Sequence, residues 1–269
     1  SRIFTMCKKI YLDAPNIGEL EKQYLTKAID SGYISTIGPF VPEFDKIVAT
    51  YLGVKKAVSV QSGTAALHVA LYELGIGNGD EVIVPALTFI ATVNPITYVN
   101  ATPVFVDIDS HTWTMNPEEI EKAVTKKTKA VIPVHLYGNP CNMVEIKRIA
   151  DKYDLYLIED ATESLGATYQ DQFTGTFGDL GCFSFNGNKT ITTGGGGMVA
   201  GNSEERINHI RYLVNQARDE SDEIYHSEIG FNYRMTNIEA SLGLAQMQRL
   251  EEFMVNKRLF YSIYQEKLK

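Results

Sequence analysis

Residues 156–201 read YLIEDATESLGATYQDQFTGTFGDLGCFSFNGNKTITTGGGGMVAG, and this stretch decides the fold class. An apolar run at residues 155–158 ends in a pair of carboxylates, the second of which is Asp160. Such a run predicts a buried strand whose carboxyl end, where α/β folds bind ligands, carries the acid. A second short strand, beginning at residues 184–185, leads into a polar turn that presents Lys189 before a glycine run. An aspartate that can hold a pyridine nitrogen protonated and a lysine that can form a Schiff base are the two groups that pyridoxal phosphate (PLP) chemistry needs.

The chain on either side alternates between strand and helix patterns. Further strands are predicted at residues 56–60, 81–85, 103–107 and 130–135. Helices are predicted at residues 17–29, 40–52, 66–74, 143–153 and 203–217, in a stretch that ends at about residue 99, from residue 117 onward, and from residue 237 to the end. This alternation predicts a mostly parallel sheet with helices on both faces, that is, a three-layer α/β/α domain. No GxGxxG pattern follows the first strand, which disfavours a nicotinamide-binding domain.

Local signals mark several helix ends. Gly32 and Gly53 follow the first two helical patterns directly, as expected for left-handed stop residues. Asn116 precedes Pro117, the order expected of an N-cap and the first helical residue. The first helix is expected to lie on the outside of the domain.

Composition narrows the function classes. The 269 residues carry a formal charge of −8 and are 44% hydrophobic, which argues for a large α/β domain and against a nucleic-acid or acidic-membrane partner. No apolar run approaches about 18 residues, and the first residues lack a signal-peptide core. Cys7, Cys141 and Cys182 show no metal-ligand spacing, so we expect reduced thiols, a cytoplasmic location and no metal site.

Two further motifs are expected to lie at the same edge of the sheet. Ser62, Gly63 and Thr64 join the strand at 56–60 to a helix, and a helix start rich in small residues can bind a phosphate. Taken alone this motif is an ordinary N-cap, but the aspartate and lysine downstream favour the phosphate site. Phe89 follows the strand at 81–85 and either stacks on a flat ring or belongs to the core.

These motifs together resemble the DegT/DnrJ/EryC1/StrS family of sugar aminotransferases, which are PLP enzymes of fold type I. The blocks that carry the resemblance are EDATES at 159–164, SFNGNK at 184–189, TTGGGG at 192–197, TIGP at 36–39, SGTAA at 62–66, PALTF at 85–89 and GFNYRM at 230–235. The likeness begins near residue 17 and continues to the end of the chain.

The resemblance implies roles for individual residues. Lys189 would form the Schiff base and move the proton, and Asp160 would pair with the pyridine nitrogen. The implied cofactor-binding residues are Gly63, Thr64, Ala65, Phe89, Asp160, Glu163, Ser184 and Lys189, with Asn232 supplied by the partner subunit. The implied substrate-binding residues are Tyr33, Thr36, His135, Asn188 and Arg234. Glu163 stands where relatives more often carry glutamine or histidine.

The resemblance also implies a reaction. It is the transfer of an amino group from glutamate, through pyridoxamine phosphate (PMP), to C4 of a nucleotide-linked 4-keto-6-deoxy-sugar for cell-surface polysaccharides. The enzyme would be a homodimer with shared active sites. The blocks most resemble the branch of legionaminic-acid-type pathways, which acts on UDP-linked sugars, and perosamine-type GDP-linked sugars come second. A PMP-dependent sugar dehydratase and a non-catalytic PLP-binding relative are the alternatives, and Lys189 in place of a histidine favours amino transfer.

The domain organisation follows from the same pattern. We expect an N-terminal extension at residues 1–15, a PLP-binding large domain at 16–236, and a long helix at 237–269 that leads toward a C-terminal small domain truncated from this chain. Residues 218–233 are polar and aromatic, and we expect either a mobile loop over the active site or a solvated connection.

Overall fold

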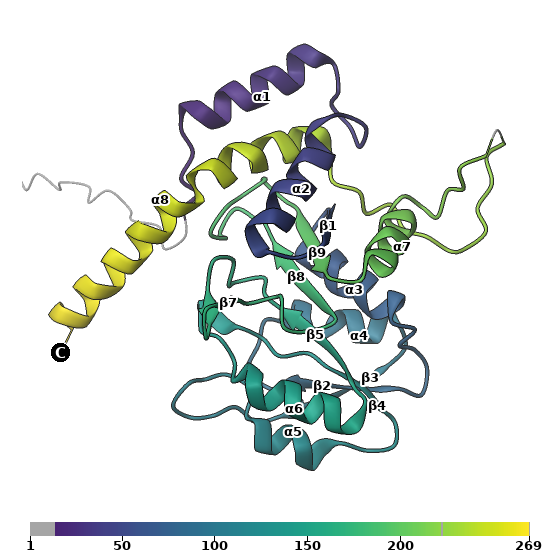
Figure 1. Cartoon of the computed structure of the whole chain (residues 1–269), viewed down its shortest axis with the longest axis vertical. Coiled ribbons are helices and arrows are strands. Elements are labelled where there is room, and N and C mark those ends of the chain that lie inside the picture. The colour runs from purple at the N-terminus through teal and green to yellow at the C-terminus, as the bar shows by residue number, and fades with distance from the viewer. Residues whose placement is uncertain (1–13, 222, 269) are drawn as a thin grey trace, which may run out of the picture.

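The computed structural model describes residues 14–221 and 223–268, and a seven-stranded sheet runs through its centre (Figure 1). The strands in spatial order are β1 (Lys56–Val60), β9 (Gly197–Gly201), β8 (Leu180–Ser184), β5 (Tyr156–Asp160), β4 (Thr128–Val131), β2 (Glu81–Pro85) and β3 (Thr102–Val106). Only β9 is antiparallel to its neighbours in this sheet, so the carboxyl ends of all the others lie at one edge. The predicted mostly parallel sheet is confirmed.

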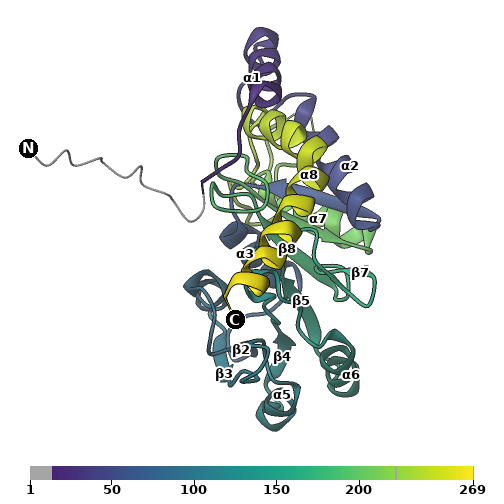
Figure 2. The same cartoon turned by 90° about the vertical axis from the view of Figure 1, so that its left-hand side faces the viewer.

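Helices cover both faces of this sheet. One face packs against α3 (Gly63–Glu73), α4 (Asn94–Tyr98) and α7 (Glu204–Val214). The other face packs against α2 (Phe40–Leu52), α5 (Pro117–Ala123), α6 (Met143–Tyr153) and the first half of α8 (Asn237–Lys267). The remaining elements are α1 (Glu19–Ser31), the 3-10 turns η1 (Ile90–Thr92) and η2 (Leu136–Gly138), and the hairpin β6 (Thr168–Tyr169) and β7 (Gln172–Phe173). Helix α1 lies on the outside, along α8, as expected (Figure 2).

Side-chain alternation along the strands explains the two-sided core. In β2, Val82 and Val84 belong to the cluster under α3, whereas Ile83 belongs to the cluster under α5 and α6. Successive strand residues point to opposite faces, so a strand covered on both faces must be apolar throughout. This is why the central strands read as continuous apolar runs in the sequence.

Several predicted boundaries agree with the structure. Strands β1 and β2 and helices α2 and α6 span the predicted residues. Gly32 and Gly53 end α1 and α2 with φ angles of 74° and 70°, the left-handed conformation expected there. The side chain of Asn116 accepts a hydrogen bond from the backbone of Glu118 and caps α5.

One predicted strand was too long and one strand was missed, both for identifiable reasons. The strand expected at residues 130–135 ends as β4 at Val131, and Pro133 beyond it cannot donate to a sheet ladder. Strand β9 was missed, because its glycine-flanked sequence GMVAG carries little strand propensity. All five of its residues are nevertheless buried between β1 and β8.

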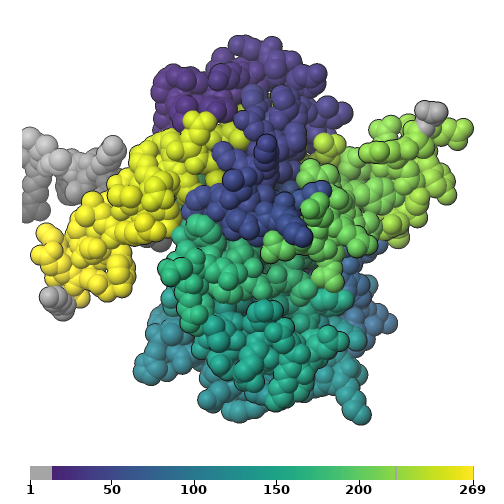
Figure 3. All heavy atoms as spheres, viewed as in Figure 1, coloured from purple at the N-terminus to yellow at the C-terminus, as the bar shows by residue number. Residues whose placement is uncertain are grey.

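Two segments project from the body of the molecule (Figure 3). One is the C-terminal half of α8, whose large apolar side chains are exposed. The other follows α7 and includes the exposed Ile224 and Ile229. Within the described ranges, no helix combines the length and the apolar character needed to cross a membrane. Cys141 and Cys182 are free and buried, while Cys7 and most of the expected N-terminal extension lie outside the described residues.

Candidate active site

A cavity of about 250 Å³ opens where the carboxyl ends of β5 and β8 meet the start of α3. The fold brings to its walls residues that are far apart in the sequence. The predicted site residues among them are Gly63, Thr64, Phe89, Asp160, Glu163, Ser184, Asn188 and Lys189. The site is therefore assembled at the sheet edge where parallel α/β folds bind their ligands.

Asp160 is the last residue of β5 and is 3% exposed. Its Oδ2 accepts a hydrogen bond of 2.6 Å from the Thr92 hydroxyl, and its Oδ1 accepts bonds from the Thr162 hydroxyl at 2.7 Å and the Thr162 backbone N–H at 3.2 Å. The Thr92 and Thr88 hydroxyls share a further bond of 2.7 Å. These donors fix the orientation of the carboxylate in the cavity wall.

The threonines around Asp160 were not predicted as site residues. Thr162 stands two residues after Asp160, and a hydroxyl at that spacing commonly bonds to a preceding aspartate in a turn. This signal was present in the sequence. Thr92 lies 68 residues away in the chain, so only the fold brings its hydroxyl to the carboxylate.

Lys189 follows β8 in a tight polar turn, where its backbone N–H donates to the Asn186 carbonyl at 3.0 Å. Its Nζ lies 3.8 Å from Glu163 Oε1, and the two side chains are only 17% and 25% exposed. Glu163 is held in turn by the backbone N–H of Tyr137, which donates to Oε2 at 2.7 Å. A partly buried carboxylate is therefore the charged neighbour of this lysine.

The first turn of α3 forms another wall of the cavity. The Ser62 hydroxyl caps the helix by accepting from the Ala65 N–H at 3.0 Å. That N–H is thus engaged inside the cap. Ala65, which the resemblance implied to be a cofactor-binding residue, is not among the residues that line the cavity. Thr64 and Ser184 present side chains there instead. A Cβ on Gly63 would lie 2.9 Å from Ser184 Cβ, so only glycine lets the helix begin this close to β8.

The glycine run before β9 packs tightly behind this wall. A Cβ on Gly197 would lie 2.4 Å from the carbonyl of Ser62 and 2.7 Å from the nitrogen of Gly63. Gly197 can thus carry no side chain if the start of α3 is to lie this close, whereas nothing lies within 4 Å of a Cβ on Gly194.

Phe89 lies at the cavity and is 71% exposed. A phenylalanine of the core would be buried, so the core alternative for this residue is excluded. A broad apolar ring beside a cavity offers a surface on which a flat group can stack.

His135 was expected to bind the substrate, but the structure does not place it at the cavity. Its side chain is fully buried, with Nε2 bonded to Glu159 at 3.0 Å and Nδ1 accepting from the Cys141 N–H at 3.1 Å. Glu159 also accepts from the backbone N–H groups of residues 175, 177 and 178. Adjacent strand residues point to opposite faces, so Glu159 points away from the cavity that Asp160 lines. Glu159 and its partner His135 therefore lie in the interior beneath the site.

Four other predicted residues lie outside the cavity. The Tyr33 carbonyl accepts from the side chain of Asn237, which ties the loop containing Tyr33 and Thr36 to the start of α8. Arg234 lines a separate cavity. Asn232 is exposed, and the rings of its two sequence neighbours, Phe231 and Tyr233, stack on each other.

The donor set of the cavity fits a PLP molecule. A helix start with nearby hydroxyls suits a phosphate, an oriented carboxylate suits a pyridinium nitrogen, and an amine in a turn suits an aldehyde. The space left by the missing Cβ of Gly63 lies at the phosphate end of this arrangement.

Comparisons with known proteins agree with this chemistry. The model of the DegT/DnrJ/EryC1/StrS aminotransferase family matches residues 15–269. The GDP-perosamine synthase of Caulobacter vibrioides is 45% identical over 260 residues, which cover 97% of this chain and 70% of that protein. The GDP-perosamine synthase of Escherichia coli O157:H7 is 45% identical over 261 residues, covering 97% and 72%. The PLP form of Spr1654 from Streptococcus pneumoniae superposes with a TM-score of 0.87 at 33% identity, covering 91% of this chain and 68% of that one, and its PMP form has also been solved.

Proposed function

The chain belongs to the DegT/DnrJ/EryC1/StrS aminotransferase family and is a PLP-dependent aminotransferase, and on that premise we propose that it transfers the amino group of glutamate to C4 of a GDP-linked 4-keto-6-deoxy-sugar. The observation that carries this proposal is the convergence of Asp160, Lys189, Phe89 and the start of α3 on one cavity.

The choice of GDP rests on the relatives. The sequence blocks favoured a UDP-linked substrate of the legionaminic-acid type and placed GDP-linked sugars second. Two relatives at 45% identity are GDP-perosamine synthases, which supports reversing that order. Nucleotide-linked sugars are intracellular metabolites in such pathways, so a cytoplasmic location accompanies the proposal.

Lys189 is proposed as the group that holds the cofactor and moves the proton. The cofactor supplies an aldehyde that condenses with amines and a pyridinium ring that withdraws electrons from the bond to be broken. Once its amine is free, Lys189 would be the residue that carries a proton to and from the substrate carbon. The Glu163 carboxylate lies 3.8 Å from that amine.

Asp160 is proposed to hold the pyridine nitrogen in its protonated form. Both of its oxygens already accept bonds from threonine hydroxyls, so the carboxylate is oriented before the cofactor binds. A group oriented in advance stabilises developing charge without reorganising during the reaction. Thr64 and Ser184 are proposed to donate to the cofactor phosphate at the start of α3.

A homodimer with shared sites completes the proposal. Asn232 is exposed at the base of the loop that follows α7, where it pairs with Asn215. Such a position suits a residue that reaches the cofactor phosphate of a partner subunit across a two-fold interface.

A substrate screen tests the function. The PLP-loaded protein would be incubated with glutamate and, in parallel, with GDP-, UDP- and dTDP-linked 4-keto-6-deoxy-sugars. We expect 2-oxoglutarate and an aminated GDP-sugar in equal amounts, detected by mass spectrometry. Amination of the UDP- or dTDP-sugar with none of the GDP-sugar would contradict the proposed nucleotide. Loss of water from the sugar without amino transfer would contradict the reaction class.

A further inference from the structure

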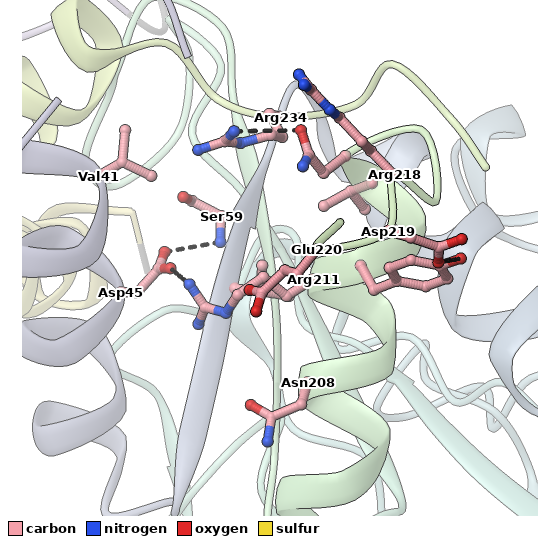
Figure 4. Close-up of a pocket in the computed structure, with 13 residues that line it drawn as sticks. Val41, Asp45, Ser59, Asn208, Arg211, Arg218, Asp219, Glu220 and Arg234 are labelled. Atoms are coloured by element: carbon pink, nitrogen blue, oxygen red, sulfur yellow. Dashed lines mark hydrogen bonds and ion pairs between the residues drawn. The ribbon is translucent and has the colours of Figure 1, made fainter. Parts of the chain in front are cut away.

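A second cavity, of about 490 Å³, lies at the free edge of β1 between α2 and α7 (Figure 4). None of the described residues lines both this cavity and the one around Lys189. It is large enough to hold a small organic molecule as well as an inorganic ion. Three arginines, Arg211, Arg218 and Arg234, contribute to its walls.

An unpaired hydroxyl points to a ligand in this cavity. Ser59 is 2% exposed, and its Oγ is the only buried side-chain nitrogen or oxygen in the described part of the chain without a hydrogen-bond partner. The Ser59 backbone N–H is satisfied by Asp45 Oδ1 at 2.8 Å. Figure 4 shows Ser59 between Asp45 and Arg234. Buried polar groups are nearly always paired in native proteins, so an unpaired one requires an explanation.

Arg234 supplies a positive charge at the same place, and no carboxylate of the described residues forms an ion pair with it. It is partly buried, and its Nη1 donates to the neutral Asn215 side chain at 3.2 Å. Of the residues that the structure describes, none places a carboxylate within 4.0 Å of Arg234 or Arg218. Burial and the nearby Arg211 lower the pKa of Arg234 and outweigh the opposing effect of Asp45, a sign that the environment disfavours the charge of this arginine.

The acids of the cavity are mostly engaged elsewhere. Asp45 pairs with Arg211 at 2.9 Å. Asp219 accepts from the Tyr212 hydroxyl at 2.8 Å and from the Ser227 hydroxyl at 2.6 Å. Glu220 is the one further acid in the lining, and it is exposed. The end of the cavity near Arg234 and Arg218 is therefore positively charged, although the overall charge of the chain is −8.

We propose that this cavity binds a small molecule through an oxyanion, either a phosphate or a carboxylate, with Arg234 and the Ser59 hydroxyl as its donors and Arg218 at its rim. The planar guanidinium can donate two parallel hydrogen bonds to either anion. The bound oxyanion would give the Ser59 hydroxyl an acceptor at hydrogen-bond distance. The site is separate from the cavity around Lys189. Its ligand would be bound in addition to the cofactor and substrate of the proposed function.

Calorimetry on the PLP-loaded protein provides the test. The bound cofactor fills the phosphate position of the other cavity, so that position does not compete for the probes. Inorganic phosphate and succinate would be titrated separately, and the tighter of the two identifies the anion class. Ser59→Ala and Arg234→Gln should each weaken binding about tenfold or more, since each removes a bond to a charged group. Arg148→Gln, on the exposed face of α6, is the matched control and should bind as the unmodified protein does.

Thermal unfolding separates a ligand site from a packing role. Without added anion, Ser59→Ala should unfold at the same temperature or higher, because it removes an unpaired buried hydroxyl. The increase in unfolding temperature that the anion gives the unmodified protein should shrink in the variant. If neither anion binds, or if Ser59→Ala binds it as tightly as Arg148→Gln, the proposal is wrong. Ser59→Ala decides the matter if Arg234→Gln does not fold.

Discussion

At the scale of single residues, Lys189 and Asp160 differ in how the protein prepares them. Asp160 has both oxygens fixed by hydroxyl donors. Lys189 has a flexible side chain whose amine lies 3.8 Å from a single carboxylate. The difference suits their proposed tasks, because one group must stay in place throughout the reaction and the other must move a proton between two positions.

Replacing Lys189 should abolish turnover while sparing cofactor binding. Lys189→Ala removes the proposed Schiff-base nitrogen and proton carrier, but Asp160 and the helix start of α3 remain. Absorbance of the dialysed variant measures retained cofactor, and a coupled assay measures 2-oxoglutarate. For the unmodified protein, borohydride reduction and peptide mapping should find the cofactor on Lys189. An adduct on a different lysine would disprove the assignment.

Asp160→Asn should fold, bind PLP and lose rate by about a hundredfold or more, equivalent to about 2.7 kcal/mol of transition-state stabilisation. An amide cannot stabilise a protonated pyridine as a carboxylate does. Thr92→Val keeps the carboxylate but removes one donor that orients it, so its loss of kcat should be smaller. Near-normal turnover of Asp160→Asn would refute the proposed role.

At the scale of elements, the starts and ends of helices and strands place the site. The first turn of α3 can approach β8 and β9 only because Gly63 and Gly197 carry no side chains. Gly197, the last residue of the glycine run, is thus part of the wall behind the proposed phosphate position.

Gly197→Ala should destabilise the fold by about 1–3 kcal/mol, the usual range for overpacking. The added methyl would lie 2.4 Å from backbone atoms of Ser62, which cannot move without disturbing α3. Denaturant unfolding measures the change. Gly187→Ala is the matched control, because nothing lies within 4 Å of its Cβ position. Equal stability of the two variants would show that the close approach is relaxed in solution.

Another element-scale feature is the attachment of the projecting segment to α7. His209 on α7 bonds Glu73 at 2.5 Å through Nδ1 and Glu228 at 3.1 Å through Nε2. Burial lowers the pKa of His209, but the bonds to the two carboxylates outweigh it, so the net direction is upward. Burial raises the pKa of Glu73. Near neutral pH the histidine governs the contact, because a carboxyl group normally titrates well below it.

The stability that His209 contributes should therefore depend on pH. A histidine whose folded pKa exceeds its unfolded value, about 6.5, stabilises fully below that value and stops doing so as pH rises through the folded pKa. Unfolding midpoints of the unmodified protein and His209→Gln should differ most near pH 6 and converge in alkaline buffer. A difference that grows with pH would contradict the charged contact.

At the scale of the whole molecule, the chain buries its sheet on both faces but leaves two projections. One is the segment that follows α7 and includes Ile224 and Ile229, and the other is the C-terminal half of α8. In the proposed two-fold dimer, Asn232, which is exposed at the base of the first projection, would contact the cavity of a second copy.

Mixing two inactive variants tests this shared site. In a hybrid of Lys189→Ala and Asn232→Ala subunits, one site loses both residues and the other keeps both. Activity should rise on mixing to at most about half the unmodified value per dimer. Subunit exchange must be confirmed separately, by native mass spectrometry. If exchange occurs without recovery, Asn232 serves its own subunit and the shared-site proposal is wrong.

The sequence by itself determined the sheet class, the two residues proposed for catalysis and the family. Apolar periodicity, helix stop signals and short motifs are local properties, and they can be read without knowing which segments meet. Only the tertiary structure decided that Thr92 orients Asp160, that His135 is buried with Glu159, and that Ser59 faces a cavity with Arg234. These relations join residues that are distant in the chain, and the packing of helices on the sheet brings them together.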